Sequence, residues 1–249
     1  MASIGSTRVR QPMELAKNCY RSARIVAKQV LGLEPIVRRN VHRELEFHGS
    51  ADCGWMVPSK FLTPESVVVD VGLGEDVTFS LSLIRKYGFQ VFGFDPTPRA
   101  IAHAETLRCP NLTVYQLGVS DKSGTAEFYL PNDPHHVSGS LLRESHVGRE
   151  CVTVRFVTIT ELLDLIGRDR IDLLKLDIEG AEYKLLHSVE FAALAPKISA
   201  ICIEFHHRWP GIGGHATLRA VRHLRSLGFG CAWRSIASNE EFTFVRCSN

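Results

Sequence analysis

The run VVVDVGLGEDVTF at residues 67–79 constrains the fold of this chain more than any other stretch. It opens with consecutive β-branched residues, which are typical of a strand covered on both faces, and it passes through a glycine turn into the start of a helix. Asp70 closes the strand, and Gly72 and Gly74 form the turn. A strand, a glycine turn and a helix in this order predict a nucleotide-like cofactor at the carboxyl end of a parallel strand.

Strands and helices alternate along most of the chain after this turn. The next strands of the sheet are predicted at QVFGFD, LTVYQLG, IDLLKLD and ISAICIEF, with helical segments between them. The final two strands, CAWRSIA and EFTFVR, are joined by only SNE, and so short a connection permits antiparallel pairing alone. The sequence therefore predicts an α/β fold whose mostly parallel sheet ends in a C-terminal antiparallel hairpin.

Helix boundaries and one insertion are also predicted. Asp76 is expected to cap the helix after the glycine turn and Gly88 to end it, while Thr97 and Pro98 should start the next helix. The strands TAEFYL and CVTVRFV interrupt the alternation and are expected to form an antiparallel pair. The polar loop between them contains HHVSGSLL, with His135 and His136, and it is either a lid over the cavity or a plain loop.

Length and composition suit one large domain with a short appendage. The chain has 249 residues and a formal net charge of +2. We expect an N-terminal helical appendage over residues 1–53 and a cofactor-binding domain over 54–249. Near-neutral charge gives no reason to expect bulk nucleic-acid binding, and no apolar run approaches the roughly 20 residues that span a bilayer. The basic helix expected over residues 12–31 either touches a membrane surface or a partner, or it simply packs on the domain.

The seven cysteines are scattered and contain no CxxC pair. This pattern predicts reduced thiols in a cytoplasmic protein rather than a disulfide framework or a zinc site.

Two cofactor classes compete for the glycine turn. A nicotinamide dinucleotide favours a third glycine where this chain has Val77, and its pyrophosphate would be repelled by Glu75 and Asp76. S-adenosylmethionine has no phosphate and carries a sulfonium and an ammonium, so it suits an acidic turn better. Asp95 ends the next strand, where a carboxylate can accept hydrogen bonds from both ribose hydroxyls. The sequence favours S-adenosylmethionine, and a nicotinamide-dependent oxidoreductase is the weaker alternative.

Several motifs together resemble the FkbM-type methyltransferases. They are VVVDVGLGEDVTF, VFGFDPTPRAI, LGVSDKSGTAEFY, VSGSL, IDLLKLDIEGAEYKLL and ICIEFHH, of which KLDIEGAE is the most specific. The turn DVGLGED departs from the commoner DIGANIG of that family. The resemblance runs from about residue 54 to the C-terminus, and it implies the class I S-adenosylmethionine-dependent methyltransferase fold, with sheet order 3-2-1-4-5-7-6 and the seventh strand antiparallel.

The resemblance also implies an activity, usually methylation of a hydroxyl oxygen on a sugar, polyketide or related small molecule. A non-catalytic binding module with the same fold is the alternative. The residues expected to contact the cofactor are Asp70, Gly72, Gly74, Asp95, Pro96, Val119 and Asp177.

Two later strands are expected to place candidate catalytic side chains at the same edge of the sheet. Asp177 ends a central strand with Glu179 just beyond it, while Glu182 suits a structural place at a helix start. On the next strand, Glu204 and His206 should share a face while His207 points away.

A hydroxyl acceptor must lose a proton, and Asp177 or His206 is the expected base, with Glu179 orienting it. His206 is preferred because neutral imidazole is well matched to pH 7. Alternatively, Asp177, Glu204 and a histidine hold magnesium or manganese, although the resemblance requires no metal.

Overall fold

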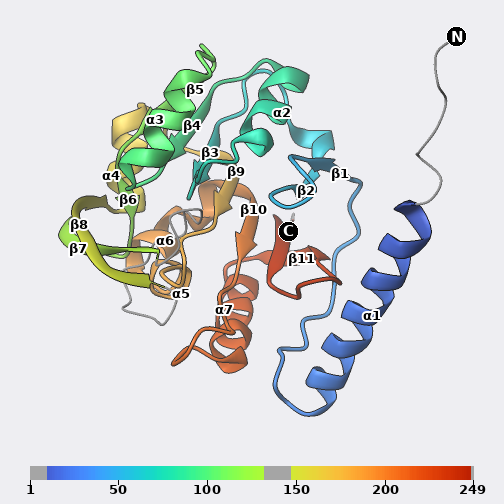
Figure 1. The fold of residues 1–249 in the computed structure, drawn as a ribbon. Helices are drawn as coiled ribbons and strands as arrows, with labels where there is room; N and C mark the ends of the chain where they lie inside the picture. The colour runs from blue at the N-terminus through green and yellow to red at the C-terminus, as the bar shows by residue number, and fades with distance from the viewer. Residues whose placement is uncertain (1–9, 132–146, 248–249) are drawn as a thin grey trace, which may run out of the picture.

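A central seven-stranded sheet with helices on both faces organises the protein (Figure 1). The computed structural model describes residues 10–131 and 147–247. The strands of the sheet are β3 (Val68–Val71), β4 (Val91–Phe94), β5 (Leu112–Tyr115), β9 (Ile171–Leu176), β10 (Ile198–Glu204), β11 (Phe229–Arg234) and β12 (Glu241–Arg246). Their spatial order is β5-β4-β3-β9-β10-β12-β11, and β12 runs antiparallel to both of its neighbours. This is the order 3-2-1-4-5-7-6, so the predicted class I methyltransferase sheet and its C-terminal hairpin are confirmed.

The sheet is buried on both faces because its strands are almost continuously apolar. Along β3, Val69 and Val71 face one hydrophobic cluster and Val68 faces another. The helices are α2 (Thr78–Tyr87), α3 (Pro98–Thr106), α4 (Ile159–Ile166), α5 (Glu182–Leu186), α6 (Val189–Leu194) and α7 (Gly214–Ser226), with 3-10 turns η1 (Ser59–Phe61) and η2 (Ala195–Lys197). Helices α4 to α7 contribute to the first cluster, and α2 contributes to the second.

Local signals placed two of the three predicted helix ends correctly. Gly88 ends α2 in the left-handed conformation, with φ of 76°, and Thr97 precedes α3 with Pro98 as the first helical residue, as predicted. Asp76 was predicted as the cap of α2, and this is wrong by one residue, because the N-cap is Val77. The Asp76 carboxylate instead accepts hydrogen bonds from the Thr78 amide at 2.9 Å and the Ser50 hydroxyl at 2.7 Å.

The predicted insertion is an antiparallel pair. Strands β7 (Gly124–Pro131) and β8 (Val147–Val157) pair antiparallel, and the short β6 (Gly118–Val119) adds to β8 in parallel. The segment HHVSGSLL, with His135 and His136, lies outside the described residues, so its predicted role as a lid stays a prediction.

The N-terminal segment contains more than the predicted helix. Helix α1 (Arg10–Val30) stands beside the sheet domain in Figure 1, and a hairpin of β1 (Leu45–His48) and β2 (Trp55–Pro58) follows. The predicted division between residues 53 and 54 passes through the turn of this hairpin. Trp55 and Val57 pack in the second hydrophobic cluster, beneath the sheet residues Val68 and Leu173.

A buried polar cluster attaches the chain after α1 to the domain. Glu34, which is 5% exposed, accepts hydrogen bonds from His207 at 2.8 Å, Arg208 at 2.8 Å and Asn239 at 3.0 Å. His207 therefore points away from His206, as the alternation predicted. None of the described helices is both long and apolar enough to cross a membrane.

Candidate active site

The glycine turn between β3 and α2 presses directly against the end of β9. Gly72 has φ of 83°, and a Cβ at this position would stand 1.7 Å from the carbonyl oxygen of Asp177. Only glycine permits both the left-handed backbone and this approach. The sequence motif thus places the turn and the KLDIEGAE segment, about a hundred residues apart, on the two sides of one cavity.

Asp95 ties the end of β4 to this turn. Its carboxylate accepts hydrogen bonds from the amide of Gly74 at 3.0 Å and from the amide and hydroxyl of Thr97 at 2.8 and 2.5 Å. The side chain is largely buried yet still lines the cavity. A carboxylate held by fixed donors keeps one orientation, as a group that recognises a ribose must.

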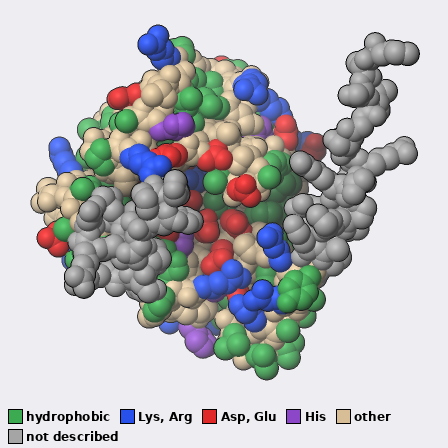
Figure 2. Space-filling view, in the orientation of Figure 1, with side chains coloured by type: hydrophobic (Ala, Val, Ile, Leu, Met, Phe, Trp, Pro, Cys, Tyr) green, Lys and Arg blue, Asp and Glu red, His purple; other side chains and the backbone are tan. Residues whose placement is uncertain are grey.

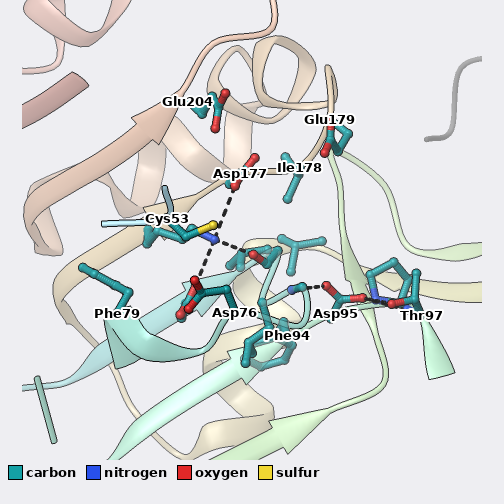
Figure 3. Close-up of a pocket in the computed structure, with 18 of the residues that line it drawn as sticks. Cys53, Asp76, Phe79, Phe94, Asp95, Thr97, Asp177, Ile178, Glu179 and Glu204 are labelled. Atoms are coloured by element: carbon teal, nitrogen blue, oxygen red, sulfur yellow. Dashed lines mark hydrogen bonds and ion pairs between the residues drawn. The ribbon is translucent and has the colours of Figure 1, made fainter. Parts of the chain in front are cut away.

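The cavity lies at the carboxyl ends of β3, β4, β9 and β10 (Figure 3). All of the predicted cofactor residues line it: Asp70, Gly72, Gly74, Asp95, Pro96, Val119 and Asp177. The predicted Glu179 and the alternative ligand Glu204 also line it. Phe79 and Phe94 supply apolar surface between the acids, which suits a flat aromatic group such as an adenine.

Acidic side chains far outnumber basic ones in this cavity. Its lining includes nine acidic residues and a single lysine among the described residues: Asp52, Asp70, Glu75, Asp76, Asp95, Asp177, Glu179, Glu204 and Glu241, with Lys175. Figure 2 shows red side chains gathered in the middle of the face turned to the viewer. Such a field favours a cationic ligand and disfavours a phosphate-bearing one.

Lys175 is a site residue that the sequence reasoning missed. It lines the cavity, and its buried ammonium lies 3.3 Å from Asp70 and 3.6 Å from Asp177 and donates a hydrogen bond to the carbonyl of Gly72. Burial alone would lower the pKa of Lys175, but Asp70 and Asp177 outweigh burial and raise it. The charged lysine therefore holds the glycine turn and the end of β9 together.

The signal for Lys175 was present but ambiguous. A lysine inside the apolar strand IDLLKLD faces burial on both sides of the sheet, and such a charge requires a partner. Asp70 occupies the matching register position on the neighbouring strand β3.

His206 lies behind the carboxylates rather than at the cavity surface. Its Nε2 atom is 3.0 Å from Glu179 and 3.8 Å from Asp177, and its Nδ1 atom is 2.7 Å from Glu182. Among the described residues His206 does not line the cavity, whereas Asp177 and Glu179 do. The structure thus brings together the three predicted catalytic residues but places them in two layers.

The acids around His206 change its protonation. Burial alone would lower the pKa of His206, but Glu182 and Glu179 outweigh burial and raise it well above 6.5. The imidazole is therefore protonated at neutral pH in this arrangement, which opposes the prediction that it acts as a neutral base. The prediction considered His206 only in the context of its own strand. It missed Glu179, from the adjoining loop, and Glu182, from α5, which contact the two ring nitrogens.

Burial raises the pKa of two carboxyl groups at this edge of the sheet, because it disfavours their charged form. Burial raises the pKa of Asp177 to about 6, although Lys175 and His206 partly offset it. Burial and the charge of Asp177 raise the pKa of Glu204 to about 9.

Glu179 and Glu182 are held in place by the loop between β9 and α5. Glu179 has φ of 54°, a left-handed conformation that costs a non-glycine residue about 1 kcal/mol. Glu182 is fully buried, and its Oε1 atom accepts hydrogen bonds from the amides of Ile178 and Gly180. These contacts are consistent with the structural role expected for Glu182. Its contact with His206 was not predicted from the sequence.

Residues 66–231 match the family model of the methyltransferase FkbM domain. The chain belongs to the FkbM methyltransferase family. The family resemblance drawn from the sequence motifs is therefore confirmed, and the sheet order described above is the one that it implied.

Curated proteins are similar in sequence to this chain over part of their length. It is 26% identical over 149 residues to the probable methyltransferase-like protein 24 of Rattus norvegicus, covering 60% of this chain and 35% of that protein. It is 30% identical over 136 residues to the 2-O-methyltransferase NoeI of Sinorhizobium fredii, covering 48% and 55%. The chain thus spans about a third to a half of the length of these two relatives.

Solved structures with a similar trace include methyltransferases. An rRNA methylase from Streptococcus thermophilus superposes with a TM-score of 0.43 at 16% identity, covering 75% of this chain and 90% of that one. SMU.1697c of Streptococcus mutans, solved in complex with SAH, gives a TM-score of 0.42 at 11% identity, covering 74% and 88%.

Proposed function

We propose that this methyltransferase uses S-adenosylmethionine to methylate a hydroxyl oxygen on a small molecule or glycan. The observation that carries the proposal is the acidic cavity at the carboxyl ends of β3, β4, β9 and β10. The sulfonium and ammonium of the cofactor suit this field, and the fixed carboxylate of Asp95 at the end of β4 supports the proposal because such a group can accept hydrogen bonds from a ribose. The relative named as a 2-O-methyltransferase supports oxygen as the methyl acceptor.

The acceptor hydroxyl would lie against Asp177 and Glu179, the two cavity carboxylates beyond the glycine turn. In the transfer, the acceptor oxygen attacks the methyl carbon in line with the bond to sulfur. That bond breaks, its electrons stay on sulfur, and the hydroxyl proton passes by way of Asp177 to solvent water. Asp177 and Glu179 orient the hydroxyl and favour loss of the proton by accepting its hydrogen bond.

Calorimetry with S-adenosylmethionine, S-adenosylhomocysteine and NAD⁺ tests the cofactor assignment. The proposal expects binding of both sulfur compounds and none of NAD⁺, because a pyrophosphate would meet Glu75 and Asp76. Binding of NAD⁺ alone would support the oxidoreductase instead. Binding of the sulfur compounds without turnover over a broad set of hydroxyl acceptors would favour the non-catalytic binding module.

Asp95→Ala sharpens this test at one residue. Loss of hydrogen bonds to a charged group should weaken S-adenosylhomocysteine binding by about 2–3 kcal/mol, or roughly thirtyfold or more. Asp164→Ala, which removes an exposed acid from α4, is the matched control and should bind like the wild type. If Asp95→Ala folds and binds the cofactor with unchanged affinity, the placement of the ribose is incorrect.

A further inference from the structure

Three side chains at the acceptor end of the cavity carry a second inference. Single ligand atoms of Asp177, Glu179 and His206 all lie within 4.8 Å of one another. The two carboxylates line the cavity, and the imidazole is buried beneath them. One nitrogen and two oxygens that converge from different elements form the kind of donor set that binds a divalent metal ion.

The spacing of these atoms is close to that of a coordination sphere. Ligands bonded at about 2.1 Å in an octahedral site are separated by roughly 3.0 Å when adjacent and 4.2 Å when opposite. His206 Nε2 is 3.0 Å from Glu179 Oε2 and 3.8 Å from Asp177 Oδ1. Both separations lie between those of adjacent and opposite ligands, and the carboxylate oxygens of Asp177 and Glu179 are within 4.8 Å of each other.

Glu182 fixes the orientation of the His206 imidazole from the side away from Asp177 and Glu179. Its fully buried carboxylate accepts the Nδ1–H of His206 at 2.7 Å, which leaves Nε2 as the ring atom directed at Asp177 and Glu179. A carboxylate that orients the far nitrogen of a histidine is the usual second layer of a metal site. The other oxygen, Glu182 Oε2, is buried and has no hydrogen-bond partner within the described residues.

The local charge balance also favours an added cation. Asp177, Glu179 and Glu182 surround one imidazole, and the nearby Lys175 is shared between Asp70 and Asp177, so these four carboxylates face only two cationic side chains among the described residues. A divalent ion would replace the proton on Nε2 and neutralise the remaining carboxylate charge.

We propose that Asp177, Glu179 and His206 bind one divalent metal ion at the acceptor end of the cavity. Manganese suits the set best, because it accepts carboxylate oxygens together with an imidazole nitrogen, whereas magnesium prefers oxygen alone. The ligand set differs from the alternative drawn from the sequence, since Glu179 takes the place of Glu204.

The role of this ion rests on the proposed function. Bound there, the ion would hold the acceptor oxygen beside Asp177 and Glu179 and would make the hydroxyl more acidic. The proton would pass to solvent water, the acceptor oxygen would form its bond to the methyl carbon, and the bond from that carbon to sulfur would break with its electrons left on sulfur. The metal thus fixes the acceptor oxygen and makes it a better nucleophile.

Manganese binding can be measured without cofactor, acceptor or turnover. The full chain, first treated with a chelator, is titrated with Mn²⁺ while the free ion is followed by electron paramagnetic resonance. The proposal expects one ion per chain and a spin-echo coupling to one imidazole nitrogen. Absence of binding up to millimolar Mn²⁺, or binding without nitrogen coupling, would overturn it.

Variants locate the ion. Glu179→Gln, on a partly exposed loop, should weaken Mn²⁺ binding at least tenfold while keeping the wild-type circular dichroism spectrum, and Asp177→Asn should do the same. His103→Gln, on the exposed side of α3, is the control for adventitious histidine binding and should match the wild type. Unchanged affinity in both acid variants would place the ion elsewhere and contradict the proposal.

Calorimetry with S-adenosylhomocysteine keeps the two proposals separate. Manganese binding without cofactor binding would retain the metal site and remove the proposed function. Cofactor binding without manganese binding would retain the proposed function and remove the metal site. His206 would then be an ion-paired structural group.

Discussion

At the scale of single residues, Gly72 has no room for a Cβ beside the backbone of Asp177. Gly72→Ala should destabilise the protein by about 3 kcal/mol or more, because its Cβ would enter the backbone of the neighbouring strand. Gly88→Ala is the matched control, since Gly88 has nearly the same φ but open space around it, and it should cost only about 1–2 kcal/mol. Urea unfolding of both variants measures the difference. Equal losses would mean that the close contact relaxes.

Lys175 is the other residue on which the site geometry depends. Lys175→Met should cost about 3–5 kcal/mol, because it leaves the buried carboxylate of Asp70 without its ion-pair partner. The double variant Lys175→Met with Asp70→Asn should recover part of that loss. Lys122→Met, at an exposed position, serves as the control and should change unfolding by less than about 0.5 kcal/mol. A loss below 1 kcal/mol for Lys175→Met would show that the pair contributes little.

At the scale of elements, the attachment of the segment after α1 should depend on pH. Burial alone would raise the pKa of Glu34, but hydrogen bonds from Asn239, Arg208 and His207 outweigh it and lower the pKa to about 2. Lys28 lies 3.7 Å away and adds positive charge. A lowered pKa contributes stability above the unfolded value near 4.5 that is lost as the pH falls towards 2.

The Glu34→Gln variant tests this linkage. Wild-type unfolding free energy should fall by about 2 kcal/mol more than that of the variant between pH 5 and pH 2.5. Glu65→Gln, an exposed acid, should follow the wild-type curve. Parallel curves for wild type and Glu34→Gln would exclude Glu34 as a source of acid sensitivity.

His207 should also make the protein less stable as the pH falls, in a higher pH range than Glu34. Burial lowers the pKa of His207, and the hydrogen bond to Glu34 only partly offsets it. A histidine with a lowered folded pKa contributes stability above its unfolded value near 6.5, and that stability is lost as the pH falls.

At the scale of the whole molecule, the chain between α1 and β1 is part of the folded domain. The amides of Asn40 and Val41 donate to the carbonyl of Cys231, and the Asn40 side chain accepts from the Cys231 amide. Val37 is buried in the larger hydrophobic cluster. This segment therefore covers the edge strand β11, which would otherwise expose unpaired backbone groups.

Two truncations test this arrangement. Removal of residues 1–31 should lower the melting temperature by only a few degrees, whereas removal of residues 1–41 should lower it by about 10 °C or more. The larger loss follows from the missing contacts of Glu34, Val37 and Asn40. Similar melting temperatures for the two truncated proteins would show that the segment adds little stability.

Much of the fold was predictable because its signals are local. The β-branched run of β3, the glycine stop of α2 and Pro98 at the start of α3 each act within a few residues. The cavity residues were predictable for a related reason, since carboxyl ends of parallel strands meet at one edge of a sheet. The predicted cap at Asp76 is wrong by one residue, and the contact of that carboxylate with the Ser50 hydroxyl, from a distant loop, could not be read from the local sequence.

The sequence by itself determined the order of strands and helices, the terminal hairpin, the family and the edge of the sheet where the acids gather. Only the tertiary structure decided that Lys175 joins Asp70 to Asp177, that Glu182 holds His206 beneath the cavity, and that residues 34–41 belong to the domain. Those contacts depend on strand register and on packing between segments far apart in the chain. Burial then sets their charge states, because a desolvated group takes its protonation from the partners that the fold brings to it.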